Sequence, residues 1–187
     1  MIIKGKRLSL RTVREKDLDA LYDLVFDAAA RGPYYPIFIW SETEYKREFQ
    51  QNGFWSDEHG ELLICDLEDR MLGEVYYFRA APYFDGYELA YRLFDVGQSN
   101  RGVMTEAVTL FTYLLFCVKK INRLELKIMP ENIASKRVAE KCGYVLEGVA
   151  RGAFFHRGAY RDLEVWSILR QEARTSLEDV LAGMRSQ

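Results

Sequence analysis

The spacing of apolar residues changes twice between positions 87 and 128. Tyr87–Leu93 follows a turn at Asp85-Gly86 and reads as a strand, and Leu124–Ile128 reads as another strand. Between them, from about 102 to 119, apolar residues recur at helical spacing, namely Val103, Ala107, Leu110, Phe111, Leu114, Leu115 and Val118. A strand–helix–strand unit of this kind indicates a mixed α/β protein in which helices cover a sheet.

The remaining segments add strands and helices on both sides of this unit. We expect strands over 7–11, 61–66, 73–79, 144–149 and 160–169, and helices over 17–30, from about 41 onward and over 132–142. The tail, 172–184, has the composition of a terminal helix. No repeat or Pro/Gly-rich linker interrupts this order, so we expect one domain, with a core of about 6–170 and an extension over 171–187.

The composition excludes several classes of protein. Of the 187 residues, 49% are hydrophobic and 29% are charged, which excludes a disordered tail. The chain has 26 Lys and Arg against 28 Asp and Glu, and a net charge of −2 gives no reason to expect direct nucleic-acid binding. No apolar run approaches the roughly 20 residues of a membrane span, so no membrane partner is expected.

The cysteines and histidines indicate neither a disulfide framework nor a metal centre. Cys65, Cys117 and Cys142 are odd in number and widely scattered, which is typical of reduced thiols in a cytoplasmic protein. They lack paired spacing, and His59 and His156 stand alone, so we expect no metal.

The segment from Tyr91 to Ala107 takes a strand through a short polar loop into a helix. The first N–H groups of a helix have no partner within it and lie at the positive end of its dipole, so they can bind a phosphate or diphosphate. Gly102 permits close approach, and Arg101 could add charge from the side. The alternative is an ordinary helix start that uses a glycine.

A second segment, Pro130 to Tyr144, places polar side chains at another helix start. The Asn132 amide can cap this helix or hydrogen-bond a ligand amide, and Ser135 lies one turn further on the same face. The alternative is a helix cap followed by a routine helix serine.

Together the two segments resemble the GNAT superfamily of acyl-CoA N-acyltransferases, and within it the RimJ/RimL branch, which contains ribosomal-protein N-terminal acetyltransferases. The matching pieces are Arg7–Arg11, Glu88–Leu93, Asn100–Ala107, Asn132–Ser135, Glu140–Tyr144, Glu147-Gly148 and Gly158–Asp162. The resemblance thus covers nearly the whole chain. The diphosphate loop of the superfamily usually reads Arg/Gln-x-x-Gly-x-Gly/Ala, whereas here its first position is Ser99 and its last is Met104.

The resemblance implies a mixed α/β sheet of seven strands, splayed into a V between its fourth and fifth strands and flanked by about four helices. It also implies that acetyl-CoA is the cosubstrate, with its pantetheine arm in the V. The residues that would contact it are Leu93, Phe94, Arg101, Gly102, Val103, Met104, Thr105 and Asn132. Main-chain groups near Leu93 and Phe94 would pair with the pantetheine amides.

Direct attack of a primary amine on the thioester is the mechanism that the resemblance implies, so none of the cysteines is expected to be a nucleophile. Glu88, on the strand before the loop, is the first candidate for the base, and the alternative is an ion-pair partner. Glu106 is a rival with a structural role at its helix start. Ser135 is the candidate that stabilises the leaving thiolate.

The acceptor site would be lined by aromatic and polar side chains from two segments, namely Tyr34, Tyr35, Phe38 and Trp40, and Phe154, Phe155, His156 and Tyr160. Such a wall could hold an ammonium group by cation–π attraction, and simple packing is the alternative. An acidic cluster, Asp57, Glu58 and Glu61, could also draw a cation.

Several alternatives remain open at this point. The acceptor is either a protein N-terminus, as of a ribosomal protein, or a small amine such as an antibiotic, polyamine or amino acid. The protein could be a monomer or a homodimer. A GNAT-like module that binds CoA or a partner without catalysis is the competing function.

Overall fold

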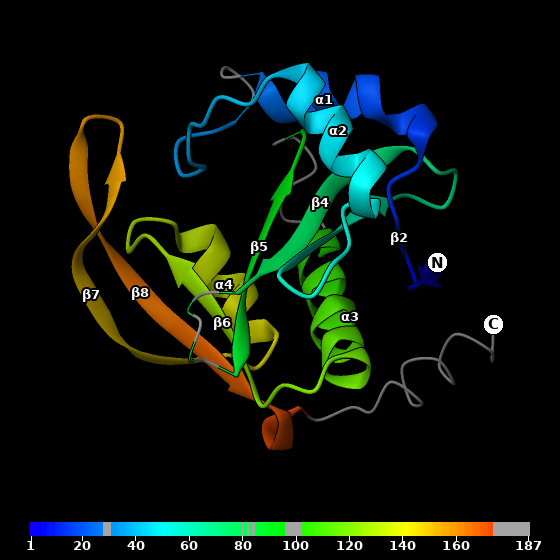
Figure 1. Ribbon diagram of the computed structural model, residues 1–187. Helices are drawn as coiled ribbons and strands as arrows, with labels where there is room; N and C mark the ends of the chain where they lie inside the picture. The colour runs from blue at the N-terminus through cyan, green and yellow to red at the C-terminus, as the bar shows by residue number, and fades with distance from the viewer. Residues whose placement is uncertain (28–30, 80, 82, 84, 96–101, 174–187) are drawn as a thin grey trace.

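The computed structural model describes residues 1–27, 31–79, 81, 83, 85–95 and 102–173 (Figure 1). Its strands are β1 (Ile2–Lys4), β2 (Ser9–Arg11), β3 (His59–Cys65), β4 (Met71–Phe78), β5 (Gly86–Leu93), β6 (Arg123–Ile128), β7 (Val145–His156) and β8 (Ala159–Leu169). Its α-helices are α1 (Leu18–Phe26), α2 (Glu42–Asn52), α3 (Val103–Val118) and α4 (Ile133–Lys141). Two short 3-10 turns, η1 (Glu15–Asp17) and η3 (Arg170–Glu172), are also seen among the described residues.

The described strands form one mixed sheet in the order β1-β2-β3-β4-β5-β6-β8-β7. Its eight strands correct the expected seven, because the N-terminus adds β1 beside β2, with Ile3 opposite Leu10. Three residues are too few to display a strand period in the sequence. The predicted mixed α/β class is confirmed.

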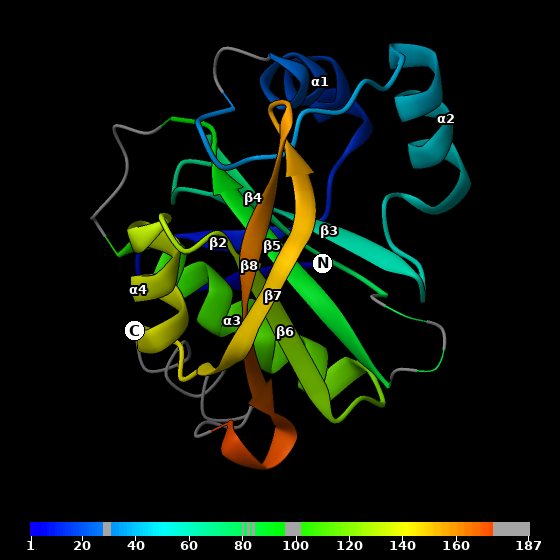
Figure 2. The ribbon, with the colours of Figure 1, turned by 90° about the vertical axis from the view of Figure 1, so that its left-hand side faces the viewer.

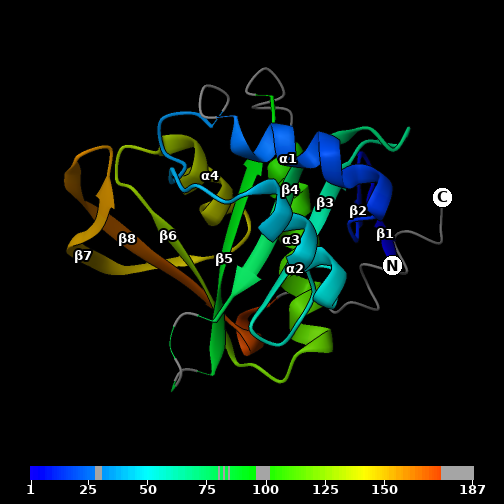
Figure 3. The ribbon, with the colours of Figure 1, turned by 45° about the horizontal axis from the view of Figure 1, so that its top comes forward.

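The sheet opens between β5 and β6, its only parallel neighbours among the described strands. Their pairing is confined to three positions and ends at Glu88 opposite Glu125. Beyond this point β5 stays paired with β4 as far as Leu93, and β6 stays paired with β8 as far as Ile128. The two halves therefore diverge, as Figure 3 shows, and the predicted V is confirmed.

Helices cover both faces of the sheet. On one face α3 and α4 pack on a core that includes Leu62 and Ile64 of β3. On the other face α1 and α2 pack on a core that includes Leu63 and Cys65 of the same strand. Successive residues of a strand point to opposite faces, so β3 is apolar on both sides. The arrangement of the helices about the sheet can be followed in Figures 1 and 2. No helix among the described residues is both long enough and apolar enough to cross a membrane.

A buried ion pair joins the start of α1 to β2. Arg11 is 2% exposed, and its Nη1 and Nη2 donate to the two carboxylate oxygens of Asp17 at 2.6 and 3.0 Å. Burial, the largest single effect, opposes ionisation of Asp17, but the hydrogen bonds from Arg11 and from the N–H of Arg14, with nearby positive charges, together outweigh it and lower the pKa of the carboxyl. This bidentate pair fixes the helix on the sheet.

The last two strands form a hairpin that extends beyond the rest of the sheet (Figure 1). Here β7 ends at His156, whereas the strand was expected to end at Val149. Most of β7 is exposed on both faces, so it lacks the alternation by which a half-buried strand is recognised. The expected tail helix lies for the most part in 174–187, outside the described residues, and so do residues 28–30 at the predicted end of the first helix.

Candidate active site

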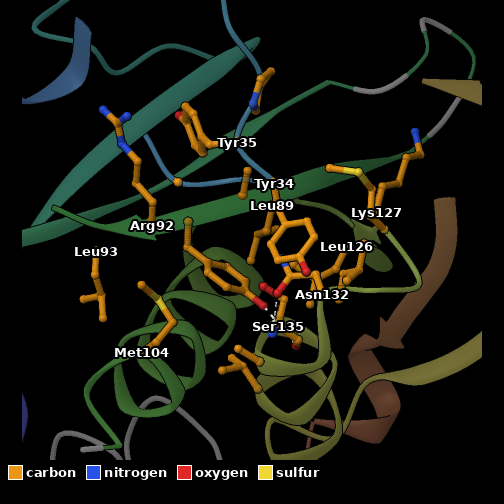
Figure 4. A pocket seen from close by; sticks show the side chains of 18 of the residues that line it. Tyr34, Tyr35, Leu89, Arg92, Leu93, Met104, Leu126, Lys127, Asn132 and Ser135 are labelled. Carbon is orange, nitrogen blue, oxygen red and sulfur yellow. Dashed lines mark hydrogen bonds between the residues drawn. The ribbon is translucent and has the colours of Figure 1, made fainter. Parts of the chain in front are cut away.

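A cavity of about 550 Å³ occupies the V between β5 and β6. Its walls come from these strands, from β4, from the first turns of α3 and α4, and from residues 31–36, which we call the acceptor segment. Figure 4 shows Arg92 and Leu93 of β5 on one side of this cavity and Asn132 and Ser135 on the other. One space therefore connects the opening of the sheet with two helix N-termini.

The start of α3 forms one wall. Gly102 caps the helix with φ +78°, and Val103, Met104 and Thr105 of the first turn line the cavity with it. The N–H of Glu106 is the first to donate to a carbonyl of the turn, that of Gly102 at 3.0 Å. The earlier N–H groups have no carbonyl partner within the helix, which is the arrangement that binds anions. Arg101 lies outside the described residues.

Along β5 the structure brings only part of the expected main-chain surface to the cavity. Leu93 lines it, and from Leu89 onward the strand has no β6 partner. Phe94 does not line it, because its N–H donates to the carbonyl of Leu72 at 2.9 Å and its ring lies 5.4 Å from the Arg92 guanidinium. The Phe94 amide is therefore not free, and that expectation is wrong.

The start of α4 forms the facing wall, where Asn132 and Ser135 both line the cavity. The Asn132 Oδ1 accepts the N–H of Ser135 at 3.2 Å, so this side chain caps the helix. The hydroxyl of Tyr91, on β5, donates to the carbonyl of Ser135 at 3.3 Å and bridges the two walls. Burial raises the pKa of Tyr91, which keeps the bridging hydroxyl protonated.

Glu88 lines the cavity at the closed end of the V. Its Oε2 lies 2.7 Å from Nζ of Lys127, and its side chain is 14% exposed. Burial raises the pKa of Glu88, and the hydrogen bond and charge of Lys127 oppose that rise. The carboxyl is thus both an ion-pair partner and a titratable group of the cavity. By contrast, the rival Glu106 uses its carboxylate to accept the N–H groups of Lys6 and Arg7.

The acceptor segment crosses toward the far half of the sheet, as Figure 3 shows, and contacts on both sides hold it there. The Tyr34 hydroxyl donates to the carbonyl of Glu131, just before α4, at 3.1 Å. From the β7–β8 hairpin, Nε2 of His156 lies 2.7 Å from the carbonyl of Pro33, and Arg157 donates to the carbonyl of Gly32 at 2.9 Å. His156 therefore holds the segment without lining the cavity itself.

Of the residues expected at the acceptor site, Tyr34, Tyr35 and Phe154 line the cavity. Trp40 packs edge-on against Tyr45, with ring centroids 5.7 Å apart, under α2. Phe155 is 61% exposed and packs against Tyr160 on the hairpin. Neither residue reaches the cavity, so their assignment to its lining is wrong.

The acidic cluster does not face the cavity either. Asp57 pairs with Lys119 at 2.7 Å, and Glu58 pairs with Arg79 at 3.2 Å. Glu61 is half-buried beside Glu74, where burial first and the neighbouring carboxyl second raise its pKa well above the usual range. None of the three supplies an acidic wall for a cationic acceptor.

A buried polar cluster behind the acceptor segment was not predicted. Nε of Arg92 lies 2.8 Å from Oε1 of Glu74, and the hydroxyls of Tyr35 and Tyr76 lie 2.9 Å apart. The Tyr35 hydroxyl also donates to Glu74 at 3.3 Å. Arg31 stands beside this group, 5.7 Å from the Tyr35 ring. The alternation of side chains along β5 could have indicated that Arg92 lines the cavity, because Arg92 lies on the same face of the strand as Glu88.

The thiols are poorly suited to nucleophilic chemistry. Burial raises the pKa of both Cys65 and Cys142 to about 11, so few of these thiols are ionised at neutral pH. Cys117 is exposed on α3 and does not line the cavity. Among the described residues, no group of three or more His, Cys, Asp or Glu side chains is placed to hold a metal ion.

Comparison with known proteins places the chain in a family. The model of the acetyltransferase (GNAT) domain matches residues 7–145. The probable N-acetyltransferase YjcK of Bacillus subtilis strain 168 is 29% identical over 184 residues, which cover 90% of this chain and 97% of the relative. The ribosomal-protein-serine acetyltransferase of Escherichia coli strain K12 is 24% identical over 167 residues, covering 87% and 93%.

The fold also matches solved structures. Spermidine N-acetyltransferase from Vibrio cholerae, in complex with CoA and spermine, has a TM-score of 0.79 at 18% identity, covering 91% of this chain and 100% of that one. The family match covers most of this chain, and the predicted RimJ/RimL-like character is confirmed by the ribosomal-protein-serine relative. The chain therefore belongs to the acetyltransferase (GNAT) family and is an N-acetyltransferase.

Proposed function

We propose that this enzyme transfers the acetyl group of acetyl-CoA to a primary amine by direct attack within a ternary complex. The observation that carries the proposal is the single cavity that joins the unpaired edge of β5 to the first turn of α3. The pantetheine arm lies along β5 from Leu89 to Leu93 and adds to its free edge. The diphosphate lies on the N–H groups of Val103, Met104 and Thr105.

Glu88 takes the proton that the amine loses. The amine nitrogen forms a bond to the thioester carbon, and the carbon–sulfur bond breaks to give an amide and CoA thiolate. A carboxyl with a raised pKa suits this role, because it accepts a proton more readily than an ordinary glutamate. Lys127, 2.7 Å away, keeps a fraction of Glu88 ionised despite its burial.

Ser135 donates a hydrogen bond to the leaving thiolate. It lines the cavity on the first turn of α4, where the positive end of the helix dipole also favours a developing negative charge. The Tyr91 hydroxyl holds the carbonyl of this residue and thereby its position across the V. Asn132 caps the same turn and contacts the pantetheine arm from the facing wall.

The test is acetyl transfer with purified protein. Release of free CoA thiol and the mass of the acetylated product are followed with acetyl-CoA and a panel of primary amines and peptides. We expect thiol release in a one-to-one ratio with acetylated amine, and loss of both in Glu88→Gln. Binding of CoA with no transfer to any acceptor in a broad panel would favour a CoA-binding module without catalysis.

A further inference from the structure

Arg31 is a buried cation with no anionic partner in the described part of the chain. The residue is 5% exposed, and no described carboxylate lies within ion-pair distance. Its Nη1 donates to the carbonyl of Pro36 at 2.6 Å, and its Cζ lies 4.4 Å from the ring centroid of Phe38. Its Nη2 is buried without any hydrogen-bond partner. A buried charge left unpaired is costly, which indicates that its counter-ion comes from outside the chain.

The charges around Arg31 do not compensate it. The carboxylate of Glu74 is already paired with Arg92, whose Nη2 is also buried without a partner. Burial and the neighbouring Glu74 raise the pKa of Glu61, which opposes its ionisation, and no described ion pair joins it to either arginine. Arg31 therefore has no carboxylate of its own in this group.

Both guanidinium groups belong to the acceptor side of the cavity. Arg31 begins the acceptor segment, and Arg92 lies on the face of β5 that also carries Glu88. Figure 4 shows Arg92 and Lys127, the partner of Glu88, at opposite ends of the strands that frame the cavity. An acceptor whose amine is at Glu88 would meet these cations with a group several bonds away from the reacting nitrogen.

We propose that the acceptor carries a carboxylate that binds Arg31, with Arg92 as a second donor, and that this contact selects the substrate. The inference rests on the proposed function and adds the class of acceptor to it. A guanidinium donates two parallel hydrogen bonds to a carboxylate, which would occupy Nη2 of Arg31. An acceptor with a second cationic group in that position is repelled instead. The carboxylate belongs either to an amino acid or to an acidic side chain near a peptide N-terminus.

The experiment compares acceptors of equal length that differ only in the distal group. One set is 6-aminohexanoate, hexylamine and cadaverine, which place an anion, a methyl group and a cation at the same distance from a similar amine. The other set is Ser-Glu-Ala-amide, Ser-Gln-Ala-amide and Ser-Lys-Ala-amide. With saturating acetyl-CoA, we expect kcat/KM for the anionic member of at least one set to exceed the others by about tenfold or more. The set that shows the preference identifies the source of the carboxylate.

Replacement of the cation tests the assignment to Arg31. In Arg31→Gln we expect the preference to fall to within about threefold, through a higher KM for the anionic acceptor. Arg31→Lys should keep part of the preference if the glutamine variant folds poorly. Arg79→Gln, an arginine of the surface pair with Glu58, is the control and should leave the preference unchanged. Unchanged thermal unfolding and CoA affinity show that a variant is folded.

Three results would overturn the inference. Equal kcat/KM across both sets, or preference for the cationic members, would remove the carboxylate contact and leave the proposed function intact. Retention of the full preference in Arg31→Gln would reassign the contact to another residue. If the wild-type enzyme bound no CoA and released no thiol with any acceptor, the proposed function itself would fail, and the inference would fail with it.

Discussion

Replacement of Gly102 by alanine tests whether the start of α3 holds the diphosphate. Gly102 has φ +78°, a left-handed conformation that costs an alanine about 1–2 kcal/mol. Gly158, in the turn between β7 and β8, has φ +82° and no atom within 4 Å of a new Cβ. Gly158→Ala therefore carries a similar backbone cost at a site remote from the cavity, and it is the matched control.

The two variants should differ both in the stability that they lose and in ligand affinity. At Gly102 the strain is relieved by a shift of the first turn of α3, and binding of CoA must reverse that shift. If the whole strain of 1–2 kcal/mol has to be restored when CoA binds, the Kd for CoA rises about five- to thirtyfold. A new Cβ at this position also lies 2.8 Å from Nη1 of Arg7, whose flexible end can yield. Calorimetric titration gives Kd, and urea unfolding gives the stability. A wild-type Kd in Gly102→Ala, with a smaller stability loss than in Gly158→Ala, would refute the diphosphate assignment, because it would show that the turn shifts without affecting binding.

Three further substitutions test the base, the thiolate donor and the fold. Glu88→Gln should lower kcat/KM about 100-fold at high pH and abolish the loss of activity that protonation of this carboxyl causes as the pH falls. Ser135→Ala should lower kcat about tenfold while the KM for acetyl-CoA stays the same, as steady-state kinetics will show. Asp17→Asn should cost about 2–3 kcal/mol in unfolding by urea at pH 7, because buried Arg11 loses its bidentate partner and keeps only the pair of its Nε with Asp69. The lowered pKa of Asp17 makes its contribution present above about pH 4 and lost as the pH falls further, so the difference should shrink at pH 3.

Carboxylates away from the cavity supply the controls. Glu58→Gln, which removes the surface pair with Arg79, should leave the pH profile in place. Asp19→Asn removes an exposed pair with Lys46 and should change stability by less than about 0.5 kcal/mol. An unaltered pH profile in Glu88→Gln would exclude it as the base. A kcat unaffected by Ser135→Ala would exclude the thiolate contact, and a change in Asp17→Asn as small as that in Asp19→Asn would contradict the buried-pair argument.

Elements with a clear apolar period could be predicted from the sequence, and others could not. The stripe that begins at Val103 predicted α3 almost to the residue. The helix expected from about 41 onward is α2, which Ser41 caps by accepting the N–H of Glu44 on its Oγ at 3.1 Å. In contrast, β1 has only three residues, and β7 is exposed along most of its length. A pattern argument detects a buried face, so an exposed hairpin or a very short edge strand escapes it.

Some residues of the site could be predicted from the sequence, and others could not. The resemblance and the helix-start chemistry indicated Gly102 and Ser135, and both line the cavity. The residues on the acceptor side of the cavity were harder to predict, because their positions depend on how segments far apart in the sequence pack against one another. Trp40 packs against the core under α2. Arg31 is a single basic residue in an irregular segment, and it lines the cavity because contacts such as that of Tyr34 with Glu131 hold this segment in place. No local pattern carries that information.

Calorimetric titration of the purified enzyme with CoA and with pantetheine tests the central claim most directly. If the diphosphate lies on the first turn of α3 and the pantetheine arm in the V, one CoA binds per chain. Pantetheine, which lacks the diphosphate, then binds at least about tenfold more weakly because it forgoes the charged contacts to the helix N-terminus. Absence of any heat with CoA, or equal affinity for the two compounds, would contradict the account.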